Sequence, residues 1–436
     1  MKRTNIIAVF LASVFSLSYA SAQEVLTLQN AIKYALQNKA ESKKAALDLE
    51  NAQYQIDEVR GGALPQINAS GSLKYNAIIP EVAIGDMRVK MGQPWNSTAI
   101  VSLNQQIFNQ ALFTGLKAAN TTREFYVINK ELTDEQLIEK VATAYYEVYQ
   151  TQLQLQTVNI NLESTTKTRN VIEGLVKAGL GKKIDLDRTN VAVNNLSANR
   201  QIVQNALELR ENALKFAIGM PMENDVKIPN ETFEIKGDIA SLDLNVDNRT
   251  EVQLYNKQIE LLQLNKKSKV ADLYPRLSLG ADFGFSGFGS GFPIGGDFSW
   301  PKTSGIGLNL SVPIFTGGAT RAKIKQADIQ IRQAEVDLEN TKLGLSLAND
   351  NAKTQIKNSL LTVNTNRSNV ELAKAVLSDT ENNYKNGLAT LTELLDAENA
   401  YADAQNNLTT SLLNYKVAEI QLIKSSGKIK SLLNEK

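Results

Sequence analysis

Four stretches of the chain alternate between apolar and polar residues, two in each half. A period of two residues is typical of a β-strand whose faces meet different environments. One such stretch alone would fit a half-buried strand of a soluble sheet. Each has about ten residues, however, which suits a tilted strand that crosses a membrane. We predict membrane-length strands over residues 66–77, 98–108, 276–286 and 304–315.

Two very long segments carry a helical pattern instead. Residues 110–176 and 319–384 contain no proline, and a helix of about 67 residues would be about 100 Å long. Their apolar residues recur at spacings of three and four, as in coiled coils. The first seam is Ile138, Val141, Tyr145, Val148, Gln152, Leu155, Asn159 and Leu162, and the second is Ile356, Leu360, Val363, Arg367, Val370, Ala373, Leu377, Thr380 and Tyr384. The polar members favour an open wall of helices, and a solid coiled-coil stalk is the alternative.

Each long helix is predicted to end in a tight hairpin. The turn signals are "KAGL" from Lys177 and "KNGL" from Lys385, where glycine breaks the helix. We place the tips at residues 177–183 and 385–391, with Thr390 or Thr392 as the cap of the second return helix. The return helices are expected over about 182–218 and 390–424, and helices also open each half, over about 28–60 and 249–273.

The order of these elements repeats. Pro65 corresponds to Pro275 at an offset of 210 residues, Phe108 to Phe315 at 207, and the two tip motifs to each other at 208. Three matches in register indicate an internal duplication. The resulting organisation is a first repeat over 23–218, a linker over 219–248, a second repeat over 249–425 and a C-terminal tail over 426–436.

The first 22 residues have the pattern of a secretory signal. Lys2 and Arg3 precede an apolar run that ends before the small residues Ala20-Ser21-Ala22. A membrane anchor is the alternative, but the run is about 12 residues long and a span needs about 20. We therefore expect a mature, exported chain that begins at Gln23.

Composition narrows the function. Without Lys2 and Arg3 the chain has 45 Lys+Arg and 46 Asp+Glu, a net charge of −1, so nothing in it attracts nucleic acid. It has no cysteine and no histidine, which removes disulfides, the commonest general base and the commonest metal ligand. The glycine-rich stretch near Gly284 lies between predicted strands and fits a surface loop. We expect neither an enzyme nor a cofactor or metal site.

Lipid chemistry sets a condition on assembly. Backbone donors and acceptors must be satisfied inside a bilayer, so an open sheet of four strands cannot lie there. Sister copies must complete a barrel: two copies would give eight strands and three would give twelve, and physics alone does not choose. Trp95 and Trp300 precede the returning strands, where either the membrane interface or loop packing would suit them.

These features together resemble the outer-membrane factor family, the TolC-like efflux ducts of Gram-negative bacteria. The similar residues are "LPQINASG" and "LYPRLSLG" before the strands, "VPIFTGGATRAKIKQA" before the long helix and "YKNGLATLTELLDAENAYADAQNNL" at the second tip. The resemblance implies an α+β membrane protein, a homotrimer with one 12-stranded barrel in outer-membrane lipid. It also implies a periplasmic α-helical barrel whose tips meet a periplasmic adaptor and an inner-membrane pump.

The resemblance further implies roles for residues at the tips. Glu393 and Asp396 would ring the pore constriction, and Tyr384 would hold the tip closed through Asp185. The adaptor would dock on Lys177, Gly179, Leu180, Asn386, Gly387 and Leu388. Glu393 and Asp396 share a helix face, and their alternative role is simply to favour a helix N-terminus.

One position departs from the family. Its best-studied members carry a basic residue two positions after the second tip glycine, where this chain has Ala389, and Lys182 and Lys183 are the candidates to replace it. Two other classes remain as alternatives. A periplasmic adaptor would show one hairpin rather than two, and a fibrous or adhesive coiled coil would need neither membrane-length strands nor matched tips.

Overall fold

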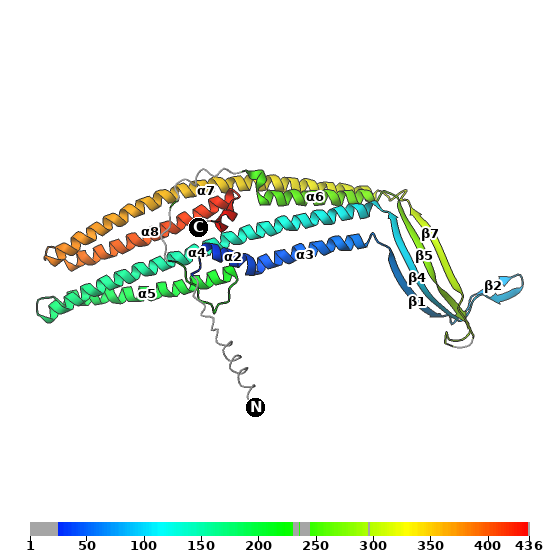
Figure 1. Ribbon diagram of the computed structural model, residues 1–436, viewed down its shortest axis with the longest axis horizontal. Coiled ribbons are helices and arrows are strands. Elements are labelled where there is room, and N and C mark those ends of the chain that lie inside the picture. Colours follow the sequence, from blue (N-terminus) through cyan, green and yellow to red (C-terminus); the bar gives the residue numbers. More distant parts are fainter. Residues whose placement is uncertain (1–24, 230–234, 236–244, 295–296, 435–436) are drawn as a thin grey trace, which may run out of the picture. The chain divides into compact units, whose positions relative to one another are not determined.

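A computed structural model describes residues 25–229, 235, 245–294 and 297–434. The proposed signal segment, residues 1–22, lies outside the described residues. The chain divides into two compact units. One contains Met1–Lys44, Leu132–Arg249 and Gly344–Lys436, and includes both hairpin ends; the other contains Ala45–Glu131 and Thr250–Leu343, and includes the sheet (Figure 1).

The sheet unit is built on antiparallel pairing of strands from both halves of the chain. Its main strands are β1 (Gln66–Tyr75), β4 (Trp95–Phe108), β5 (Arg276–Gly289) and β7 (Lys302–Ser311). They lie side by side in the order β1-β4-β5-β7, with the short β6 (Phe298–Ser299) also paired to β5 (Figure 1). The first and second repeats therefore meet where β4 pairs with β5.

The strands lie where they were predicted, but several of their bounds differ by two to four residues. β4 begins at Trp95 because Trp95 pairs with Tyr75 and Gly289, so this tryptophan belongs to the strand rather than to the loop before it. β7 ends at Ser311, before the turn-forming segment with Pro313. The loop after β1 also contains an unpredicted hairpin, β2 (Glu81–Ile84) with β3 (Met87–Lys90), turned by Gly85 at φ 62°.

The long helices have nearly the predicted bounds. They are α4 (Gln110–Lys177) and α7 (Ala319–Lys385), and their partners in the hairpins are α5 (Lys183–Ile218) and α8 (Leu391–Ser425). α6 (Thr250–Ala271) opens the second repeat, after the short 3₁₀ helix η2 (Val246–Asn248). In the sheet unit, Lys257 Nζ of α6 lies 2.6 Å from Glu124 Oε2 of α4, and Lys266 Nζ lies 2.7 Å from Asp328 Oδ1 of α7.

The first helix of the chain is broken, contrary to prediction. α2 (Leu28–Asn38) and α3 (Ala40–Gly61) are separated by Lys39, whose backbone is extended at φ −67° and ψ 137°. Lys39 Nζ donates to Phe216 O at the end of α5 across 2.7 Å. Gly219, in the left-handed region at φ 74°, packs so closely on the break that an added Cβ would lie 3.1 Å from Lys39 Cα. The break thus receives the C-terminus of α5.

The first seam is only partly as predicted. Ile138, Val141, Tyr145 and Val148 are buried, but the buried series then continues one residue earlier than expected, at Thr151, Val158, Thr165 and Ile172. The buried positions shift because Tyr145, Val148 and Thr151 follow one another at two successive spacings of three residues. The shift keeps the amide of Asn159 exposed, whereas the Thr151 hydroxyl is satisfied by Glu147 O within its own helix.

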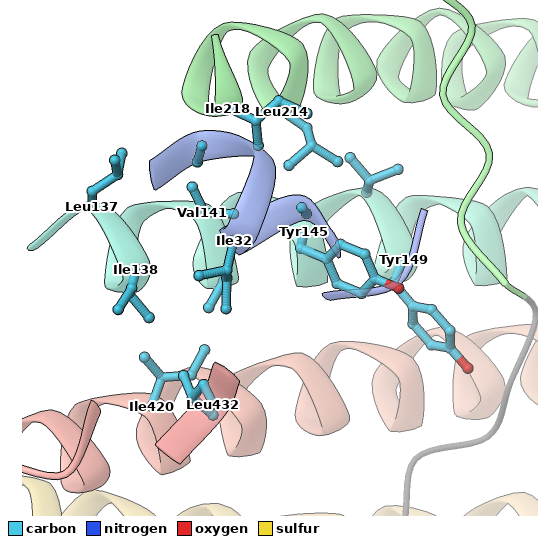
Figure 2. Close-up of a cluster of buried hydrophobic side chains, with 14 of the residues drawn as sticks. Ile32, Leu137, Ile138, Val141, Tyr145, Tyr149, Leu214, Ile218, Ile420 and Leu432 are labelled. Carbon is cyan, nitrogen blue, oxygen red and sulfur yellow. The ribbon is translucent and has the colours of Figure 1, made fainter. Parts of the chain in front are cut away.

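A hydrophobic cluster holds the hairpin unit together. Figure 2 shows Ile32 of α2 lying among Val141 of α4, Leu214 and Ile218 of α5, and Ile420 of α8. Fully burying a side chain of this size contributes about 1.5–3 kcal/mol. Two segments that the sequence places outside the repeats belong to this core as well: Val226 and Ile228 of the linker, and the 3₁₀ helix η3 (Ile429–Leu433) of the C-terminal tail. Linker residues 230–234 and 236–244 lie outside the described residues.

Candidate channel wall and hairpin ends

The register of the sheet places most apolar residues of the four main strands on one face. Leu103 of β4 lies opposite Ile67 of β1 and Ala281 of β5, and Ala281 in turn lies opposite Ile306 of β7. Directly opposed residues in an antiparallel pair share a face. The other face carries polar and small residues, such as Asn68, Ser102 and Asp282. Such a sheet suits lipid on one side and water on the other.

Two further features fit a membrane position for this sheet. In the described part of the chain, β1 pairs only with β4 and β7 only with β5, so each presents one open edge. Aromatic rings gather at the end of the sheet where Trp95 lies: its ring centroid is 4.8 Å from that of Tyr75 and 5.2 Å from that of Phe292. Aromatic belts of this kind mark membrane–water interfaces. Among the described helices, none is both long and apolar enough to span a membrane.

The two hairpin ends have the same backbone design. Gly179 and Gly387 both have φ 73°, in the left-handed region that glycine favours. In each turn the next residue bonds back to the helix: Leu180 N donates to Leu175 O and Leu388 N donates to Asn383 O, both across 2.8 Å. This is the Schellman motif. The six predicted docking residues are all exposed at these turns, and the two leucines, Leu180 and Leu388, are 80% and 78% exposed.

The structure brings Asp185 and Tyr384 together across the two hairpins. Tyr384 lies in the last turn of α7 and is partly buried, while Asp185 lies in the first turn of α5. Burial raises the pKa of the Tyr384 phenol, and the nearby negative charge of Asp185 raises it further. The phenol therefore stays protonated and able to donate a hydrogen bond at any physiological pH.

Glu393 and Asp396, the predicted constriction residues, have different surroundings. Glu393 forms a capping box at the start of α8: its Oε2 accepts from Thr390 N across 2.6 Å, and Glu393 N donates to Thr390 Oγ1. The Thr390 hydroxyl also donates to Oε2 across 3.0 Å. The pKa of Glu393 is lowered by the bond from the Thr390 backbone N–H first and by the bond from this hydroxyl second. The cap is thus Thr390, not Thr392. Asp396 is exposed and lines a groove of about 730 Å³ between α5 and α8.

The same groove contains a contact that the sequence did not reveal. Arg188 of α5 donates from Nη1 to Thr392 Oγ1 at the start of α8, across 3.1 Å. The structure thus places a basic side chain, that of Arg188, at the second tip despite Ala389. Only the i+3 spacing of Arg188 from Asp185, which places both on one helix face, could have suggested it.

A second contact between the hairpins is buried. Glu398 of α8 is 4% exposed, and its carboxylate accepts hydrogen bonds from three hydroxyls of α4. Thr165 Oγ1 donates to Oε2 across 2.9 Å, and Ser164 and Thr168 donate to Oε1 across 3.3 and 3.4 Å. Burial raises the pKa of Glu398, more than the hydroxyls lower it. The hydroxyl spacing in "STTKT" is a weak signal that sequence reasoning passed over.

Membrane-length strands that lead into helices of 68 and 67 residues, each paired with a shorter return helix, fit the class of outer-membrane exit ducts. The chain matches the family model described as outer membrane efflux protein over residues 31–220 and 243–428, and it belongs to that family. Its place is therefore the outer membrane, and its family is one of channels rather than enzymes. The adaptor and fibre alternatives are not favoured.

Individual relatives are distant but match over most of their length. The chain is 23% identical to the outer membrane protein TolC of Escherichia coli over 427 residues, which cover 94% of this chain and 84% of TolC. It is 23% identical to the alkaline protease secretion protein AprF of Pseudomonas aeruginosa over 332 residues, 74% of this chain and 68% of AprF.

Solved structures share the fold. The crystal structure of the outer membrane protein VceC from Vibrio cholerae matches with a TM-score of 0.73 and 20% identity, covering 92% of this chain and 96% of VceC. That of the Campylobacter jejuni CmeC outer membrane channel matches with a TM-score of 0.75 and 17% identity, covering 92% and 85%.

Proposed function

We propose that three copies of the chain form one exit duct, in which their strands close a 12-stranded barrel and their helices form a periplasmic α-helical barrel. The observation that carries the proposal is the sheet with one apolar face and an open edge on β1 and on β7. An open edge is not stable in lipid. β1 and β7 run antiparallel to each other in the sheet, so β7 of one copy can pair with β1 of the next.

The hairpin ends are the proposed docking site of a periplasmic adaptor and an inner-membrane pump. The matched Schellman turns and the exposed Leu180 and Leu388 support this role, because six such turns would give three copies a repeating apolar rim. Among the relatives, AprF is an alkaline protease secretion protein and SrpC is a solvent efflux pump outer membrane protein, so both secretion and efflux are represented. The cargo is accordingly a drug, metal, peptide or protein selected by the pump.

The proposed gate combines the residues of both hairpins. Asp185 and Tyr384 hold the closed tip, and Asp396 and Glu393 form the constriction. Three copies would bring six carboxylates round one axis, which attracts cations and disfavours anions. In the closed tip the Glu393 carboxylate is committed to capping α8, so Asp396 is the main source of this selectivity.

Disulfide trapping tests the ring directly, since the chain has no cysteine of its own. Ser70→Cys on β1 is combined in turn with Gly307→Cys and Asn309→Cys on β7; all three positions lie on the polar face. We expect one combination to give a covalent trimer in outer-membrane extracts on oxidation. The matched control pairs Ser70→Cys with Ser278→Cys on β5, two strands away within the sheet, and should give none.

Fractionation and conductance complete the test. The proposal requires that detergent extracts of the outer membrane contain trimers whose electrophoretic mobility changes on heating. It also requires that these trimers form ion channels in planar bilayers. A water-soluble single chain that never enters bilayers would overturn it, as would trimers without any conductance.

A further inference from the structure

Glu398 is a carboxylate buried at the joint between the two hairpins without a basic partner among its hydrogen bonds. Its side chain lies on α8, and the hydroxyls that bind it lie on α4, two from adjacent residues and the third one turn further on. Thr165, which makes the shortest of these bonds, is itself only 1% exposed. An ionised carboxylate in such a site loses its hydration, and neutral hydroxyls replace only part of it.

The charges on the helices round Glu398 do not neutralise it. On α4, Glu163 and Lys167 pair with each other across 2.7 Å at the surface. On α7, the negative charge of Glu381 raises the pKa of Glu398 further. Other charged residues on adjoining faces include Arg169 on α4, Asp187 and Arg188 on α5, and Asp396 on α8. Of the two arginines, Arg169 faces Glu173 and Arg188 donates to Thr392.

Two cavities flank this carboxylate and give it a route to water. One is the groove of about 730 Å³ that also contains Arg188 and Asp396. The other, of about 170 Å³, lies among α4, α7 and α8 and includes Tyr401 and Gln405. A small separation of α8 from α4 would therefore hydrate Glu398, whereas the packed arrangement excludes water from it.

We propose that Glu398 is a positioning residue that couples proton uptake to the packing of the second hairpin on the first. With Glu398 protonated, α8 packs on α4 and the hairpins stay together. With Glu398 ionised, packing is less favourable, because separated hairpins let water reach the carboxylate. The chain thus carries a pH-dependent bias against packing, opposed by contacts such as that of Arg188 with Thr392.

The direction of the pH dependence follows from proton linkage. Because packing raises the pKa of Glu398, the packed state binds the proton more tightly than the separated state. Packing is unaffected below the ordinary pKa of 4.5 and becomes less favourable as the pH rises from there through the raised pKa. Each unit of pKa difference changes the packing equilibrium about tenfold between the protonated and ionised forms.

A single introduced thiol reports the packing. Ile172 is 2% exposed and follows Thr165 by seven residues and Thr168 by four, so it lies on the same face of α4. Ile172→Cys is labelled with 4,4′-dithiodipyridine, which reacts at acid and neutral pH, in purified full-length protein between pH 4 and 8. Dividing each rate by that of the Ile172→Cys, Glu398→Gln protein at the same pH removes the thiol's own titration.

We expect this ratio to rise at least about tenfold from pH 4 to pH 8 if packing raises the pKa by one unit or more. Thr165→Val keeps the shape of the side chain but removes the shortest hydrogen bond to the carboxylate, so the midpoint should move to higher pH. Glu163→Gln, an exposed change on α4, should leave the curve as it is. A ratio that stays flat, or a midpoint unmoved by Thr165→Val, would overturn the proposal.

This inference rests on the proposed function because it places the hairpin ends at the inner mouth of a duct. The Glu398 coupling and the duct can nevertheless fail separately. Thiol labelling tests the Glu398 coupling whether or not the protein conducts. Conductance in planar bilayers tests the duct whether or not labelling depends on pH. If both proposals hold, the opening of wild-type channels should depend on pH between pH 4 and 8. Channels of the Glu398→Gln variant should lose that dependence.

Discussion

Arg188 Nη1 donates a hydrogen bond to Thr392 Oγ1 across 3.1 Å, and so joins the return helix of the first repeat to the start of the return helix of the second. Both side chains are exposed, so water competes for the bond. Its position nevertheless lets it affect closure of the tip, because both hairpins end within a few residues of it. In a trimer, three such bonds would act together on the tip.

We expect Arg188→Ala to loosen the closed tip. An exposed hydrogen bond of this kind contributes about 0.5–1 kcal/mol, which corresponds to a roughly two- to fivefold rise in open probability per protomer. Single-channel recordings in planar bilayers measure it. Arg188→Lys should fall between the wild type and the alanine variant, since lysine keeps the charge but not the planar group.

Arg200→Ala is the matched control for this prediction. Arg200 lies on the same helix, but its Nε donates to Asn159 Oδ1 of α4 across 2.8 Å, within the first hairpin. It should leave the open probability near that of the wild type. An equal effect of both alanine variants would mean that loss of an arginine from α5, not loss of the contact between hairpins, opens the tip.

The Thr390–Glu393 capping box predicts a local change with pH. Its hydrogen bonds lower the pKa of Glu393, so its contribution to the helix start is complete above pH 4.5 and is lost as the pH falls through the lowered pKa. Thr390→Ala should cost about 0.5–2 kcal/mol, which raises hydrogen exchange in the first turn of α8 by about 2- to 30-fold. Mass spectrometry of peptides from this turn measures the exchange.

Two substitutions check the mechanism of that cap. Thr390→Ser keeps the hydroxyl and should keep the protection. Glu393→Gln can still form the box, so it should retain protection at neutral pH and lose the dependence on acid. If Glu393→Gln exchanged as fast as Thr390→Ala at neutral pH, the charge rather than the hydrogen bonds would hold the helix start.

Much of this architecture could be predicted from sequence because its signals are local and repeated. The period of two in the strands and the glycines at Gly179 and Gly387 each point to one local structure. The break at Lys39 could not be predicted, because nothing in "LQNKAESKK" ends a helix. It is explained only by contacts with the end of α5, where Lys39 donates to Phe216 O and Gly219 packs against the break. Tertiary contacts there override helix propensity.

The candidate site divides in the same way. Asp185, Tyr384, Glu393 and Asp396 were selected because the tip motifs resemble those of the outer-membrane factor family, although the capping role of Glu393 and the exposed position of Asp396 needed the side chains. Arg188 and Glu398 were not selected, because their partners are about 200 residues away or more. A contact between repeats leaves no periodic pattern in a single sequence.

Asp396 should determine cation preference more strongly than Glu393. Asp396→Asn removes an exposed carboxylate, whereas Glu393→Gln alters one that is already engaged by Thr390. We expect the asparagine variant to lower the cation-to-anion permeability ratio clearly and to raise conductance, and the glutamine variant to do so less. Reversal potentials under a salt gradient measure the ratio, and an effect of Glu393→Gln equal to that of Asp396→Asn would contradict this assignment.

Gly387 should be required for its backbone conformation rather than for space. An added Cβ would meet nothing within 4 Å, yet φ is 73°, a region that costs other residues roughly 1–2 kcal/mol. Gly387→Ala should therefore speed hydrogen exchange at the second turn by about 5- to 30-fold, and Gly387→Asn should do so less, because asparagine tolerates this region. Gly344→Ala, in the middle of α7 with equal space and without a positive φ, is the control and should slow local exchange, since alanine favours a helix. Equal exchange in the alanine and asparagine variants would show that the turn does not depend on the left-handed backbone.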